Sequence, residues 1–146
     1  MKTKFILLVT LITSLAFGHE GVELGPNGGR ILEFSKNETM HGELTVKGGK
    51  FHIALLDKDM KPVSMDKQSL TATLGDRNAP QKLTVEADKT GFIVPLVKDG
   101  EWLILQYKNA PDAKAITARF EYNTKICEEC KEQEWVCKCK PKNDKK

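Results

Sequence analysis

Four cysteines are the residues of this chain whose type and spacing point most directly to chemistry. They lie within residues 127–139, in the pattern C-x2-C-x6-C-x-C. Thiolates bind soft and borderline metal ions, and four of them form tetrahedral zinc sites in which a C-x-x-C turn supplies two ligands. The pattern favours a metal site, zinc first and copper(I) second, with Trp135 shielding one side. The expected ligands are Cys127, Cys130, Cys137 and Cys139.

Two other uses of the four thiols stay open. In an oxidising compartment adjacent thiols form disulfides, and strain within C-x-C would direct two bridges across the halves of the motif. A thiol-exchange centre is the least favoured use. A catalytic C-x-x-C normally begins a helix, whereas Glu128 and Glu129 are expected here to raise the pKa of the thiols.

The three histidines form a secondary set of metal ligands. Period-two alternation places His41 on the outward face of its strand together with Glu43, and His52 is expected to be exposed as well. Each histidine taken alone is an ordinary surface residue. Together with a free N-terminus at His19 they would suit copper(II) or zinc, so His19 and His41 are secondary candidate ligands.

The N-terminus predicts export. Lys2 and Lys4 precede an apolar stretch that is too short to span a membrane, and Ala16 and Gly18 follow as small residues at a cleavage signal. Cleavage after Gly18 would leave His19 as the first residue, and cleavage after Ala16 would leave Phe17. We expect a periplasmic or secreted protein with no transmembrane segment.

Composition and motifs exclude several classes of function. The formal charge of +3 includes two lysines of the predicted signal peptide, and basic residues are interspersed with acidic ones, which argues against nucleic-acid binding. The chain has no H-E-x-x-H motif, no Gly-rich phosphate loop and no serine in a plausible triad context. We therefore expect a non-enzymatic protein whose partner is a metal ion. In the rival interpretation the partner is an envelope protein.

About eight short alternating runs between Gly28 and Tyr122 predict an all-β fold. Turn-forming segments separate the runs, and no segment has a sustained helical period. This pattern is typical of an antiparallel, immunoglobulin-like β-sandwich of about 7–8 strands with a short Cys-rich C-terminal extension. The eight runs are GGRILEF, MHGELTV, FHIALLD, SLTATLG, QKLTVEA, GFIVPLV, EWLILQY and KAITARFEY.

The segment GPNGGRILEF, followed by MHGELTV and FHIALLDKDMKPV, resembles small exported bacterial β-sandwich proteins. Their N-terminal segment is similar to the opening of periplasmic heavy-metal efflux adaptors, and some of them end in a C-x-x-C…C-x-C tail. The resemblance implies metal handling in the periplasm, with His19, His41 and the four cysteines as contacts. This chain has only one histidine before GPNGG and lacks the coiled-coil and lipoyl-like segments of an adaptor.

The expected organisation is a signal peptide (1–18), a β-sandwich (19–123), a four-cysteine motif (124–140) and a disordered basic tail (141–146). Everything after about Asn123 is expected to lie outside the core, so that a chain lacking residues 124–146 would fold but lose its metal. The rival interpretation is an envelope interaction module whose cysteines form two disulfides that stiffen a docking tail. The sequence leaves the oligomeric state open.

Overall fold

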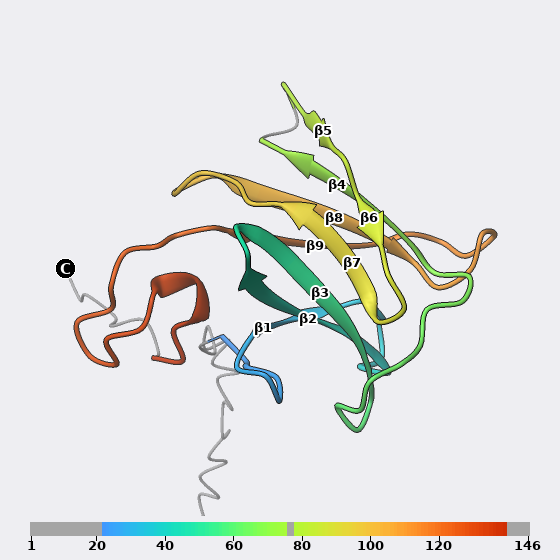
Figure 1. Cartoon of the computed structure of the whole chain (residues 1–146), viewed down its shortest axis with the longest axis horizontal. Coiled ribbons are helices and arrows are strands. Elements are labelled where there is room, and N and C mark those ends of the chain that lie inside the picture. The colour runs from blue at the N-terminus through green and yellow to red at the C-terminus, as the bar shows by residue number, and fades with distance from the viewer. Residues whose placement is uncertain (1–21, 76–77, 140–146) are drawn as a thin grey trace, which may run out of the picture.

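The computed structural model describes residues 22–75 and 78–139 (Figure 1). This part of the chain forms nine strands in two antiparallel sheets, so the predicted all-β sandwich is confirmed. The first sheet has the order β1-β2-β3-β7-β6, and the second has the order β5-β4-β8-β9. The strands are β1 Arg30–Glu33, β2 Met40–Lys47, β3 Lys50–Asp57, β4 Ser69–Leu74, β5 Gln81–Leu83, β6 Glu86–Ala87, β7 Gly91–Pro95, β8 Trp102–Lys108 and β9 Ile116–Glu121.

The strand order is that of an immunoglobulin-type sandwich. In the first sheet β2, β3, β7 and β6 take the places of strands A, B, E and D, and β1 extends the sheet beyond A. In the second sheet β4, β8 and β9 take the places of C, F and G, with β5 added beside C. Among the described residues, no helix is long and apolar enough to cross a membrane.

One predicted strand is in fact two. The run QKLTVEA contains β5, which pairs with β4 in the second sheet, and β6, which pairs with β7 in the first. Thr84 and Val85 carry the chain from one sheet to the other. A strand that changes sheets keeps its extended backbone and its alternation, so the sequence pattern shows no break at this point.

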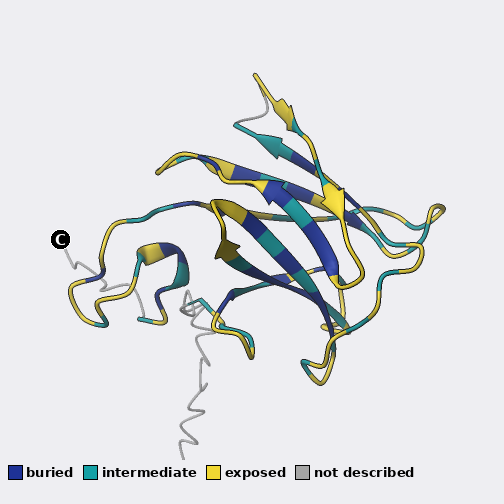
Figure 2. Ribbon diagram, viewed as in Figure 1, coloured by how far each residue is buried: buried dark blue, intermediate teal, exposed yellow. Residues whose placement is uncertain are grey.

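The core lies between the two sheets, where buried residues alternate along the strands (Figure 2). The ring of Phe34 stacks on that of Tyr107 with centroids 4.6 Å apart. Gly42 makes room for this pair, because a Cβ at position 42 would overlap the Phe34 ring. Leu44, Phe51, Leu103 and Leu105 are completely buried.

The predicted exposure of β2 was wrong. His41 and Glu43, which were expected to point outward, are only 4% and 1% exposed, whereas Val46 on the opposite face of the strand is 37% exposed. Nδ1 of His41 lies 2.9 Å from a carboxylate oxygen of Glu33 in β1. The reason for the difference is that the outer face of β2 is covered by neighbouring chain rather than by solvent.

A hairpin that contains the GPNGG segment covers Glu43. The Glu43 carboxylate accepts hydrogen bonds from the Asn27 amide at 2.7 Å, the Asn27 side chain at 2.7 Å and the Gly29 amide at 3.0 Å. A side chain at Gly25 or Gly29 would collide with Glu43 or with the β2 backbone, and Gly28 has a φ of 75°. The glycines of this segment are therefore required by close packing around a buried carboxylate.

Candidate metal centre

The first cysteine pair lies in a short hairpin after β9. Ile126 pairs with Gln133 across this hairpin. The Cys127 amide donates to the Glu132 carbonyl at 2.8 Å, and the Lys131 amide donates to the Cys127 carbonyl at 3.0 Å. Lys131 adopts a left-handed conformation with a φ of 63°, which reverses the chain directly after Cys130. The backbone of the C-x-x-C turn is thus fixed by its own hydrogen bonds.

The second cysteine pair is placed by a short 3₁₀ helix, η1 (Glu134–Val136). The Trp135 amide donates to the Asn123 carbonyl at 3.0 Å, so the helix returns to the point where the segment leaves the sandwich. The Cys137 amide donates to the Glu134 carbonyl at 3.2 Å, which brings Cys137 back over the hairpin.

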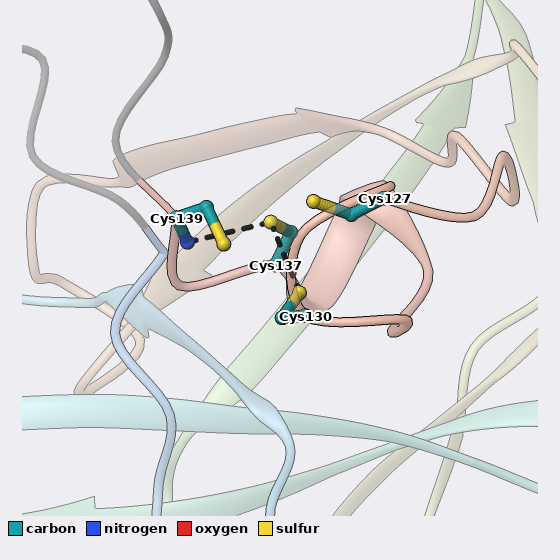
Figure 3. A group of neighbouring side chains, drawn as sticks. All are labelled: Cys127, Cys130, Cys137 and Cys139. Carbon is teal, nitrogen blue, oxygen red and sulfur yellow. Dashed lines mark hydrogen bonds between the residues drawn. The ribbon is translucent and has the colours of Figure 1, made fainter.

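The four sulfur atoms converge on one point (Figure 3). All lie within 4.8 Å of one another, and the Sγ atoms of Cys130 and Cys137 are 3.5 Å apart. All four thiols are free, and no pair approaches the disulfide bond length of about 2.05 Å. Cys127 and Cys137 are buried, whereas Cys130 and Cys139 are partly exposed.

This spacing fits a tetrahedral metal. With Zn–S bonds of about 2.3 Å, the sulfurs of a tetrahedral site are about 3.8 Å apart, a value between the 3.5 Å and 4.8 Å found here. A single ion therefore fits among the four sulfurs after small side-chain shifts. In the described residues, this is the only group of histidine, cysteine and acidic side chains arranged to hold a metal.

Backbone amides already point at two of the sulfurs. The amides of Cys130 and Glu129 donate to Cys127 and lower its pKa to about 7. The Cys139 amide lies 3.3 Å from the Cys137 sulfur, although burial raises the Cys137 pKa to about 11. The expectation that Glu128 and Glu129 would raise the pKa of the C-x-x-C thiols was wrong for Cys127, because these backbone donors dominate.

Cys139 holds its proton more tightly because neighbouring thiols crowd it. The proximity of the Cys130 and Cys137 thiols raises the pKa of Cys139. Four adjacent thiolates repel one another, and a divalent cation among them removes that repulsion. The arrangement is chemically suited to binding a cation with release of protons.

Trp135 attaches the candidate metal segment (residues 124–139) to the sandwich and does not merely shield the sulfurs. It is 7% exposed and belongs to the hydrophobic core, with ring centroids 5.5 Å from Tyr122 and 6.4 Å from both Phe51 and Phe120. The segment after Asn123 was expected to lie outside the core, and for Trp135 this was wrong. A chain lacking residues 124–146 would expose these three aromatic rings.

The histidines lie apart from the sulfurs. His41 is buried in β2 beside Glu33, and His52 is half-buried in β3, where it belongs to a small polar pocket with Glu43 and Asp88. Neither joins the cysteine group. His19 and the predicted signal peptide lie outside the described residues, so the role predicted for His19 stays a prediction.

Two residues near the N-terminus support the site and carried no signal in the sequence. The Val22 amide donates to the Cys137 carbonyl at 3.2 Å. Arg30 Nη1 donates to the Trp135 carbonyl at 3.1 Å, and its guanidinium lies 5.4 Å from the centroid of the Phe120 ring. The residues joined by these two hydrogen bonds are more than one hundred positions apart, so no local pattern could have paired them.

Comparisons with known proteins add no relative. No protein-family model matches the chain, and neither the curated proteins nor the solved structures contain a significant match. The resemblance to small exported β-sandwich proteins therefore remains a prediction from sequence motifs.

Proposed function

We propose that this protein is an exported, non-enzymatic metal-binding protein that holds one thiophilic ion between Cys127, Cys130, Cys137 and Cys139. The observation that carries the proposal is the convergence of all four sulfurs within 4.8 Å. Backbone donors to Cys127 and Cys137 add support, because N–H groups aimed at sulfur stabilise the thiolate form that binds metals.

Zinc is the first choice for the ion. It accepts four thiolates in a closed tetrahedral site, and the sulfur spacing is compatible with that geometry. Copper(I) is the second choice because it also prefers soft thiolate ligands, but it is satisfied by fewer of them. The histidines are not needed in either case, since the four sulfurs complete the coordination.

The role of such a site in the cell is metal binding, buffering or delivery in the periplasm. The partial exposure of Cys130 and Cys139 supports exchange, because a competing ligand can approach the ion from their side. A buffering site releases zinc to a chelator within the time of a mixing experiment, whereas a purely structural site retains it until the protein unfolds.

Metal titration tests the site. Reduced protein is titrated with cobalt(II), whose absorption bands report tetrahedral sulfur coordination, and zinc is then added as a competitor. We expect one equivalent of cobalt to give a four-sulfur spectrum that one equivalent of zinc abolishes. A spectrum typical of nitrogen and oxygen ligands, or saturation that survives the loss of all four cysteines, would transfer the metal to other residues and refute the proposal.

Fractionation tests export separately. Expression of the full chain in a bacterial host is followed by osmotic release of the periplasm and N-terminal sequencing of the mature protein. We expect the released protein to begin at His19 or Phe17. Retention of an uncleaved chain in the cytoplasm would contradict the predicted signal peptide without affecting the metal site.

A further inference from the structure

The two halves of the cysteine site are held in different ways. The Cys127 and Cys130 turn is closed by hydrogen bonds within its own hairpin. Cys137 instead follows η1, and the contacts that fix this part of the chain reach other regions of the protein. They are the burial of Trp135, the bond from Arg30 to the Trp135 carbonyl and the bond from Val22 to the Cys137 carbonyl.

The contact made by Arg30 differs from the other two because it involves a charged side chain. Its guanidinium lies between the Phe120 ring and the Trp135 carbonyl, and burial lowers its pKa. Among the described residues it forms no ion pair, since the three ion pairs found there involve His41, Lys50 and Lys58. A partly desolvated cation is costly, and within the described part of the chain its compensation comes from a ring face and one carbonyl of the metal segment.

We infer that Arg30 and Trp135 are positioning residues for the metal site, coupling metal binding at the cysteines to docking of residues 134–139 on the aromatic end of the sandwich. This inference rests on the proposed function. Docking places Cys137 and Cys139 opposite the preformed hairpin, so less ordering remains to be done when the ion binds.

The coupling must be reciprocal. If docking raises the affinity for the metal, the bound metal favours docking by the same factor. Coupling factors between sites typically lie between about 5 and 150. Removing the metal is therefore expected to loosen Trp135 from the rings of Phe51, Phe120 and Tyr122. Weakening the contacts of Arg30 or Trp135 is expected to lower the affinity for the metal without changing the number of ions bound.

The test needs Trp135 to be the only tryptophan. The chain has two, and the other, Trp102, is 45% exposed, so Trp102→Phe provides a reporter background. In this background the emission of Trp135 and its quenching by acrylamide are measured on reduced protein, zinc-loaded and after zinc is removed by a chelator. Zinc affinity is measured by chelator competition for the reporter protein and for its Arg30→Gln, Arg30→Lys and Arg119→Gln variants.

Arg119 is the matched control because it is an exposed arginine on β9. We expect Arg30→Gln to weaken zinc binding by about tenfold, within the usual range of coupling, with one zinc still bound. Arg30→Lys is expected to restore part of the loss, and Arg119→Gln should bind zinc like the parent. Chelation should shift the Trp135 emission to longer wavelength and increase quenching in the parent protein.

Two outcomes overturn the inference and are distinguishable. If the parent binds one zinc, but Arg30→Gln binds it as tightly as Arg119→Gln and Trp135 stays shielded after chelation, the coupling is wrong and the proposed function stands. If the parent binds no zinc or copper(I) at the cysteines, the proposed function fails and the coupling fails with it.

Discussion

Two short loops of this protein surround an electron-rich group with backbone amides, and they differ in how fully they satisfy it. In the GPNGG hairpin, the buried Glu43 carboxylate accepts three hydrogen bonds of 2.7–3.0 Å. In the cysteine segment, four sulfurs within 4.8 Å share a few N–H donors between them.

The difference shows what each loop requires. The carboxylate of Glu43 is satisfied by the chain itself, and glycines admit the backbone close enough to do so. The neighbouring Cys130 and Cys137 thiols raise the pKa of Cys139, and only a cation at the centre would satisfy all four sulfurs at once. A loop of the first kind stabilises the fold, whereas a loop of the second kind is suited to binding a metal.

The largest expected effect comes from removing one sulfur. In the proposed site, Cys137→Ser replaces a buried sulfur ligand by a weakly coordinating hydroxyl, so zinc affinity should fall by more than the roughly 10–100-fold typical of changes outside the ligand set. Chelator competition measures the loss. Glu43→Gln serves as the control from the other loop and should bind zinc like the parent protein. Equal zinc binding by Cys137→Ser and the parent would remove Cys137 from the site.

Trp135→Ala should have the next largest effect, on stability. Truncating a buried tryptophan is expected to lower the free energy of unfolding by about 3–5 kcal/mol, because the rings of Phe51, Phe120 and Tyr122 lose their neighbour. Urea unfolding monitored by circular dichroism measures this change. Trp102→Ala, at a position that is 45% exposed, should change it by no more than about 0.5 kcal/mol. Similar costs at both positions would show that residue 135 is not part of the core.

Glu43→Gln sharpens the contrast between the loops. The substitution removes the charge from an acceptor of three hydrogen bonds and turns one of its oxygens into a donor that faces other donors. We expect a loss of about 1–3 kcal/mol in the free energy of unfolding, of the same size with and without chelator. Glu121→Gln, on the exposed face of β9, is the control. A loss that appears only in the presence of chelator would tie Glu43 to the metal site instead.

The smallest effect concerns the start of the metal segment. The Thr124 hydroxyl and amide donate to Asp99 at 2.7 and 2.6 Å and hold the pKa of that carboxyl below its usual range. Because the pKa of this carboxyl is depressed in the folded state, its charged form stabilises the fold at pH values above the ordinary pKa of about 3.9. This stabilisation is lost as the pH falls below that value.

Asp99→Asn should therefore slightly lower the melting temperature at neutral pH and reduce its fall on acidification below about pH 4. Thermal melts over that pH range measure both changes. Identical acid profiles for the variant and the parent would show that this contact contributes nothing. Asp57 and Asp88, whose pKa values are also lowered, should retain the rest of the acid sensitivity.

Much of the fold could be predicted from the sequence, because alternation and turn residues are local signals. They identified the runs of all nine strands, including β5 and β6 as a single run. They failed on the outer face of β2, where burial of His41 and Glu43 depends on chain that is distant in sequence. GPNGG was noticed as a motif, but its partner Glu43 lies 14 to 16 residues away from the donors.

The cysteine cluster was predictable for the same reason: its four cysteines lie within 13 consecutive positions. Its attachment to the sandwich was not, since Arg30 and Trp135 are 105 residues apart. The lowered pKa of Cys127 was also missed, because it depends on the direction of backbone amides in the turn rather than on the charges of neighbouring side chains.

The most direct test of a four-thiolate metal site uses protein purified from the exported fraction without chelator. Bound metal is determined by elemental analysis, and thiols are counted on the same sample before and after denaturation with chelator. The proposed function predicts about one zinc or copper per chain, with all four thiols reactive only after the treatment. A sample without metal or thiols would mean two disulfides, which would contradict the metal site and favour an envelope interaction module.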